Sequence, residues 1–160
     1  MTSIKQSIRT GISFGLVSGI ITTLGLIVGL NSGTHIKMVI VGGILVIAVA
    51  DAFSDALGIH VSEESNEQRN EKDIWESTLS TFFSKFIIAL TFLFPVLLFK
   101  LYSAIIISVI WGLLLIGLFS FYIAKQQKKK ALPIVLEHIF IAVLVIIITN
   151  YVGSLVSTYI

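Results

Sequence analysis

Five long apolar stretches most limit what this chain can fold into. Each holds about 20 residues with few charges, the length that a helix needs to cross the hydrocarbon core of a bilayer. Hydrophobic residues make up 56% of the 160-residue chain and charged residues only 12%, a composition that a water-soluble domain does not have. The sequence predicts an all-α integral membrane protein with a single five-helix domain, its helices at about 10–30, 38–58, 81–99, 101–124 and 132–152.

The distribution of lysine and arginine predicts the orientation in the membrane. With the N-terminus in the cytoplasm, nine basic residues lie on the cytoplasmic side and two, Lys37 and Lys100, on the other side. The nine are Lys5, Arg9, Arg69, Lys72, Lys85, Lys125, Lys128, Lys129 and Lys130. Five spans then place the C-terminus on the side opposite the cytoplasm. The basic run at 128–130 is interpreted as part of this bias, and no nucleic-acid partner is expected.

Two aspartates, Asp51 and Asp55, interrupt the second apolar stretch. An acidic side chain inside a span costs roughly 2.5–3.5 kcal/mol on insertion scales, so it is a candidate for a functional site. A spacing of four residues places both carboxylates on one helix face, and two like charges so close need a cation nearby if both are to stay ionised. We therefore expect a cation site, to which Ser54 and, at a matching depth on the first helix, Ser18 and Thr22 would add neutral oxygens.

The hydrophilic segment at 62–77 carries a second set of carboxylates on the cytoplasmic side. The set is Glu63, Glu64, Glu67 and Glu71. In helical phase the last three share one face, and the first shares a face with His60. Carboxylates with an imidazole suit divalent iron, manganese or zinc, and carboxylates alone also suit calcium. These acids either gather a metal ion or form an ordinary solvated helix surface of mixed charge.

Small residues recur along one face of the first apolar stretch at intervals of three or four. Such a seam lets two membrane helices approach closely. It packs either within one chain or between the first helices of two copies, and we expect a homodimer formed through it. The seam glycines are Gly11, Gly15, Gly19, Gly25 and Gly29. The chain has no cysteine, which excludes disulfides and thiolate metal sites.

Two segments of the chain resemble a known family. Residues 14–30, FGLVSGIITTLGLIVGL, and 50–65, ADAFSDALGIHVSEES, are similar to the first and second helices of the vacuolar iron transporter family. Phe94 with Pro95, and the ending at 150–156, NYVGSLV, are similar to parts of its third and fifth helices. The resemblance implies a five-helix homodimer that exports ferrous iron or manganese from the cytosol against protons. Its path would run between the protomers, lined by the first two helices.

Three residues depart from the family pattern. The aspartate of the family's first helix falls on Ser18, the methionine of its second helix falls on Asp55, and Asp51 stands where the family has a small residue. Loss of the methionine thioether favours manganese, calcium or magnesium relative to iron. The metal-binding domain that plant-type members carry after the second helix is reduced here to the segment 62–77.

The sequence thus predicts a transporter of divalent metal cations, Fe²⁺ or Mn²⁺ and alternatively Ca²⁺, with no permanently bound cofactor and no enzymatic activity. Asp51 and Asp55 of two protomers would form a four-carboxylate site at the dimer axis. The alternative is a non-transporting membrane scaffold with the same fold, suggested by the serine at position 18. An aspartyl protease dyad is disfavoured, because carboxyls that share a proton stand about 3 Å apart and side chains at this spacing are roughly 5–6 Å apart at Cβ.

Overall fold

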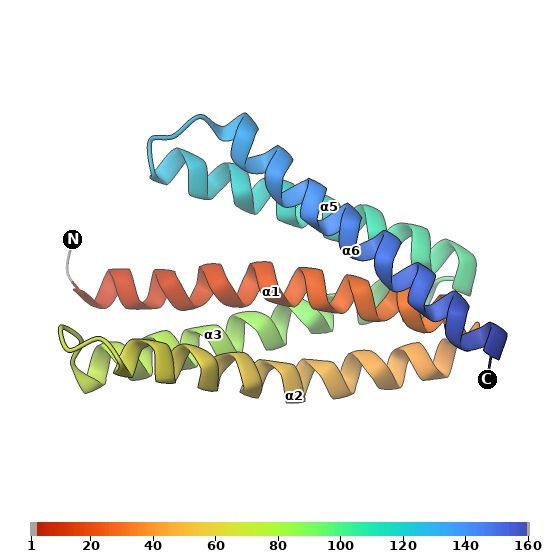
Figure 1. Ribbon diagram of the computed structural model, residues 1–160, viewed down its shortest axis with the longest axis horizontal. Helices are drawn as coiled ribbons and strands as arrows, with labels where there is room; N and C mark the ends of the chain where they lie inside the picture. The colour runs from red at the N-terminus through yellow and green to blue at the C-terminus, as the bar shows by residue number, and fades with distance from the viewer. Residues whose placement is uncertain (1–2, 160) are drawn as a thin grey trace. The chain divides into compact units, whose positions relative to one another are not determined.

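The computed structural model describes residues 3–159 (Figure 1). The elements are α1 (Ser3–Thr34), α2 (Lys37–Glu64), α3 (Glu71–Thr91), α4 (Leu93–Leu98), α5 (Leu101–Gln126) and α6 (Ala131–Tyr159). No strand occurs in this part of the chain, so the prediction of an all-helical protein is confirmed. Each predicted helix is present, and α1, α2, α3 and α6 extend beyond the predicted range by several residues at one end or both.

Five helices are long and apolar enough to span a membrane, with α3 and α4 together forming one of them. Such an arrangement fits a multi-pass membrane protein, because helices satisfy their own backbone hydrogen bonds in lipid. Only 6% of the residues in the most apolar part of α6 are buried inside the chain, although this helix is the most apolar of the five spans. A surface of that kind is stable against lipid rather than water.

The third span begins at Glu71, earlier than the predicted start at 81. The side chain of Asn70 caps this helix, since its Oδ1 accepts a hydrogen bond of 2.9 Å from the backbone N–H of Asp73. Glu71 and Asp73 also place negative charge in the first turn, where the helix dipole favours it. The polar segment 62–77 therefore consists of the end of α2, a short turn and the start of α3.

The third span is broken at Phe92, three residues before Pro95. Proline lacks an amide hydrogen, and its ring clashes with the carbonyl group four residues earlier, which here belongs to Thr91. As a result α3 ends at Thr91 and the short helix α4 begins at Leu93.

The chain divides into two compact units, which are described separately. Unit 1 holds α1 up to Gly19, α2 from Leu45 onward, and α3. Unit 2 holds α1 from Ile20 onward, α2 up to Ile44, and α4, α5 and α6.

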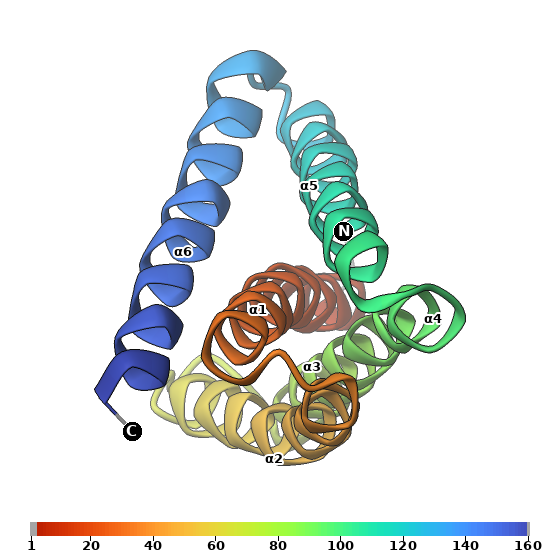
Figure 2. The same cartoon turned by 90° about the vertical axis from the view of Figure 1, so that its right-hand side faces the viewer.

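In unit 1, α1 packs against α3 at very short range, because α1 has glycines at the points of contact (Figures 1 and 2). A Cβ atom built on Gly11 would lie 2.3 Å from the carbonyl oxygen of Ser77. One built on Gly15 would lie 2.6 Å from the carbonyl oxygen of Thr81. The glycine face of α1 is therefore occupied by α3 within the chain, which is the packing that small residues permit.

In unit 2, α5 and α6 form a helical hairpin, and the second half of α1 packs against α6 (Figure 2). A Cβ on Gly25 would lie 3.0 Å from Val145, and one on Gly153 would lie 2.2 Å from the carbonyl oxygen of Gly29. Ser32 also donates a hydrogen bond to Asn150 of α6. The glycine seam is thus used inside the chain in both units, and the homodimer stays a prediction.

Candidate functional site

The interior of unit 1 holds a lysine whose ammonium group contacts both aspartates singled out by the sequence. Lys85 Nζ lies 2.5 Å from Asp51 Oδ2 and 2.5 Å from Asp55 Oδ2. It also donates a hydrogen bond of 2.9 Å to Ser18 Oγ. The lysine side chain is only 1% exposed. These four residues, named the Lys85 cluster below, come from α1, α2 and α3 and form the candidate site.

The Lys85 cluster lies close to the midpoint of each helix that contributes to it. Asp51 is the fifteenth of the 28 residues of α2, and Ser18 is the sixteenth of the 32 residues of α1. Lys85 is the fifteenth of the 28 residues in the span Glu71–Leu98. An isolated charge at such a depth costs roughly 2.5–3.5 kcal/mol on insertion scales. The ammonium and the carboxylates reduce this cost by pairing with one another.

The assignment of Lys85 to the cytoplasmic side is wrong. A helix starting at 81 would place this lysine in its first turns, whereas the observed start at Glu71 places it at the centre. Without Lys85 the basic residues number eight against two, a bias in the same direction. The signal that could have revealed it is a polar stripe at four-residue steps, since Ser77, Thr81 and Lys85 are all buried along one face of α3.

The glycines of α1 make room for the stem of Lys85. A Cβ atom on Gly19 would lie 3.2 Å from Lys85 Cγ, and one on Gly15 would lie 3.1 Å from the backbone nitrogen of Lys85. Because α1 has no side chains at these two points, the lysine stem passes directly along it and the ammonium reaches the carboxylates of α2. The seam that brings α1 and α3 together therefore also positions the charged group.

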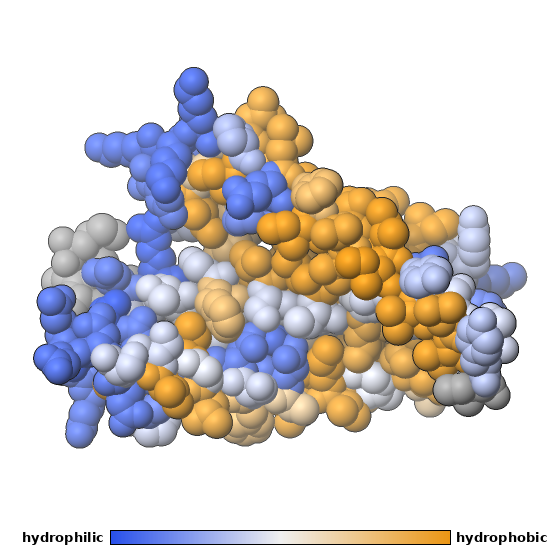
Figure 3. All heavy atoms as spheres, in the orientation of Figure 1, coloured by the Kyte–Doolittle hydropathy of each residue, from blue (hydrophilic) through white to orange (hydrophobic). Residues whose placement is uncertain are grey.

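With both carboxylates ionised, the Lys85 cluster has one positive and two negative charges, a net charge of −1. Asp51 and Asp55 are 26% and 19% exposed, so each carboxylate has an open side. Figure 3 shows hydrophilic atoms at the surface over the middle of α2, beside hydrophobic neighbours. One uncompensated negative charge, partly accessible at mid-span, favours the approach of a further cation.

Of the predicted oxygen ligands, Ser54 does not join the Lys85 cluster and Thr22 belongs to the other unit. Ser54 is exposed on α2, and within the described residues it has no hydrogen bond or ion pair. Thr22 belongs to unit 2, where its Oγ1 is buried without a hydrogen-bond partner. Of the oxygens expected around the cation, those of Asp51, Asp55 and Ser18 are brought together.

The four acids of the polar segment are spread over two helix ends and a turn. Glu63 and Glu64 close α2, Glu67 lies in the turn, and Glu71 begins α3. The expectation that the last three share one helix face is wrong, because α2 ends before Glu67. Within the described part of the chain, no three His, Cys, Asp or Glu side chains lie where they could hold a metal ion together.

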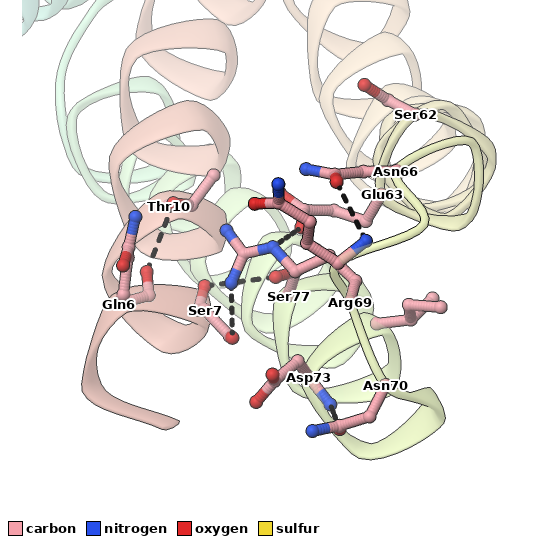
Figure 4. Close-up of polar contacts among 12 residues, drawn as sticks. Gln6, Ser7, Thr10, Ser62, Glu63, Asn66, Arg69, Asn70, Asp73 and Ser77 are labelled. Atoms are coloured by element: carbon pink, nitrogen blue, oxygen red, sulfur yellow. Dashed lines mark hydrogen bonds and ion pairs between the residues drawn. The ribbon is translucent and has the colours of Figure 1, made fainter. Parts of the chain in front are cut away.

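One of these acids is paired with an arginine at the polar end of unit 1 (Figure 4). Arg69 Nε lies 2.7 Å from Glu63 Oε2, and Arg69 Nη1 donates a hydrogen bond of 3.4 Å to Ser7 Oγ. The hydroxyl of Ser77 donates to the Ser7 carbonyl at 3.2 Å. The turn between α2 and α3 is thereby tied to the start of α1, a contact that the sequence did not reveal.

An apolar groove of about 430 Å³ lies between α2 and α3 of unit 1, and none of the Lys85 cluster lines it. Its lining includes the aromatic side chains of Phe53, Trp75 and Phe82. His60 was expected to act with Glu63, but its Nδ1 lies 3.0 Å from Thr78 Oγ1. The His60 ring also packs edge-on against Trp75. This histidine therefore belongs to the wall of the groove.

The fold and the charged cluster fit the class of multi-pass membrane proteins that carry ionised side chains inside their spans. In such proteins these side chains usually mark ion or proton paths. Comparison with protein-family models and with curated proteins finds no match for the chain.

Proposed function

We propose that the chain is a transporter of divalent metal cations of the iron and manganese type, in which Asp51 and Asp55 bind the transported ion. The observation that carries this proposal is the pair of partly exposed carboxylates, Asp51 and Asp55, gathered with Lys85 and Ser18 at the midpoint of three helices. Carboxylate and hydroxyl oxygens are hard ligands that suit Mn²⁺, Ca²⁺ and Mg²⁺ and also accept Fe²⁺. The hydroxyl of Ser18 supplies a third oxygen beside the two carboxylates.

A second copy of the chain is part of the proposal. Asp51 and Asp55 are 26% and 19% exposed at mid-span, where contact of a carboxylate with lipid is costly. A second copy facing this side of α2 would cover them and bring four carboxylates together. The proposed dimer contact therefore involves the aspartate face of α2 instead of the glycine seam of α1.

The proposed direction of transport is export from the cytosol, with the N-terminus on the cytoplasmic side. The chain has no cysteine, so single cysteines report sidedness without background. We expect a membrane-impermeant maleimide to label Lys128→Cys only from the cytoplasmic side and Lys100→Cys only from the opposite side. The reverse pattern would contradict the orientation.

Transport is tested with the purified full chain in proteoliposomes, by measuring the uptake of Fe²⁺, Mn²⁺, Ca²⁺ and Mg²⁺ in parallel. We expect flux of at least one ion, and a decrease of about tenfold or more in Asp51→Asn/Asp55→Asn, because the amides remove the charge that binds the cation. Glu137→Gln, which neutralises an exposed acid on α6, serves as the matched control and should keep the flux. Absence of flux for every ion from folded wild-type protein would contradict the proposal.

A non-transporting scaffold is the second candidate, and the ion pairs of Lys85 favour it. The ammonium already contacts both carboxylates, which is what a purely structural cluster requires. A scaffold predicts no ion flux from the wild-type protein. It also predicts that neutralising Lys85, Asp51 and Asp55 together leaves the phenotype of cells intact, while a bulky residue at Gly15 does not.

A further inference from the structure

We propose that Lys85 substitutes for the transported cation. After the ion has left, the ammonium of Lys85 occupies the carboxylates of Asp51 and Asp55. The empty transporter can then make its return step. This inference rests on the transport function proposed above. It assigns to one side chain of the site a role in the transport cycle.

The geometry of the ammonium supports this role. Lys85 Nζ contacts one oxygen of each carboxylate at 2.5 Å and the Ser18 hydroxyl at 2.9 Å. These are the same oxygens that a bound metal ion would use, so the ammonium and the ion exclude one another there. The lysine is 1% exposed, whereas the carboxylates are 26% and 19% exposed. A cation therefore reaches the carboxylates from their exposed side and displaces the ammonium when it binds their oxygens.

The transport cycle contains a step in which a substitute cation is needed. A carrier with one central site alternates between inward-open and outward-open states. For net transport it must make this change both with the ion bound and with the site empty. An empty site would expose two bare carboxylates at mid-span, which is strongly unfavourable. An ammonium on a flexible four-carbon stem fills the site without a second ion from solution. It also competes with the bound ion, which helps the ion to leave.

Loss of the lysine charge should therefore affect two kinds of flux differently. Net uptake into empty vesicles requires the empty carrier to return, and this return depends on Lys85. Exchange of labelled for unlabelled ion uses only the ion-bound carrier in both directions, so it does not need the substitute. A merely structural role of Lys85 would change both fluxes together.

The experiment uses the full chain in proteoliposomes with the membrane potential clamped and ⁵⁴Mn²⁺ as the probe. Net uptake is measured into vesicles without manganese, and exchange into vesicles loaded with unlabelled Mn²⁺. Lys85→Met is compared with wild-type protein and with Lys72→Met, which makes the same substitution at an exposed position of α3. Each variant is first shown to be monodisperse in detergent. Lys85→Gln, which is neutral but keeps hydrogen-bond donors, replaces Lys85→Met if the latter does not fold.

We expect Lys85→Met to keep exchange within severalfold of wild type and to lose net uptake by about a hundredfold, the factor that an uncompensated charge at mid-span imposes on a rate. Lys72→Met should keep both fluxes.

Net uptake that persists in folded Lys85→Met would overturn the inference and indicate that protons fill the empty site. Loss of both fluxes would also overturn it, since Lys85 would then be needed for binding. Wild-type protein with neither flux would instead refute the transport function itself.

Discussion

Replacement of Lys85 by methionine is expected to lower the free energy of unfolding by about 3 kcal/mol, close to the lower limit for breaking a buried ion pair from one side. The substitution removes the only cation that contacts Asp51 and Asp55 among the described residues and leaves two carboxylates uncompensated at mid-span. The partial exposure of the two aspartates keeps the effect near that limit. The measurement is an unfolding titration of the purified protein in detergent at fixed pH.

Removing the carboxylates together with the ammonium should reverse this loss. In Lys85→Met/Asp51→Asn/Asp55→Asn no charge remains in the cluster, and replacing a complete buried ion pair by neutral groups is often neutral or stabilising. We therefore expect the triple variant to be more stable than Lys85→Met by about 2 kcal/mol. If the single and triple variants lose the same stability, the lysine acts through its packing and not through its charge.

Alanine at Gly11 is expected to destabilise the protein by about 2–3 kcal/mol, the upper part of the range for an added methyl group in a tightly packed region. Its Cβ would lie 2.3 Å from the carbonyl oxygen of Ser77 and 2.9 Å from the backbone nitrogen of Thr81. Both are backbone atoms of α3, so a change of side-chain rotamer cannot relieve the clash. Thermal unfolding in detergent measures the effect as a lower transition midpoint.

The matched control is Gly58→Ala, which makes the same substitution on α2 within unit 1. A Cβ atom at Gly58 meets nothing within 4 Å. Alanine there adds helix propensity without a clash and should leave stability unchanged or raise it by up to about 1 kcal/mol. Equal losses at the two positions would mean that the close approach of α1 and α3 is not what Gly11 provides.

The charged residues of the site were partly visible in the sequence. Asp51 and Asp55 stand out because each interrupts an apolar run, and this contrast needs no knowledge of neighbouring helices. Lys85 stands in a comparable run. The predicted start of the third span, residue 81, is ten residues later than the observed start at Glu71, and it puts the lysine near the membrane surface. The cap at Asn70 and the polar stripe on α3 are the local features that correct this start.

The acids of the polar segment show a different limit. A shared face for these acids requires one continuous helix, whereas α2 ends at Glu64 and a turn separates it from α3. The partner of Glu63 is Arg69, which follows that turn. A pairing of this kind depends on how the chain reverses, and residue spacing carries no information about the path of a turn.

The sequence by itself determined the helical class, the five apolar spans, the break near Pro95 and the presence of two carboxylates inside a span. These properties follow from hydropathy and local backbone chemistry, which act between residues close in the chain. Only the tertiary structure decided that the cation beside Asp55 is Lys85, 30 residues away, and that α3 covers the first glycines of α1. Periodicity shows which face of a helix is polar or small, but the helix that meets this face is chosen by the packing of the whole chain.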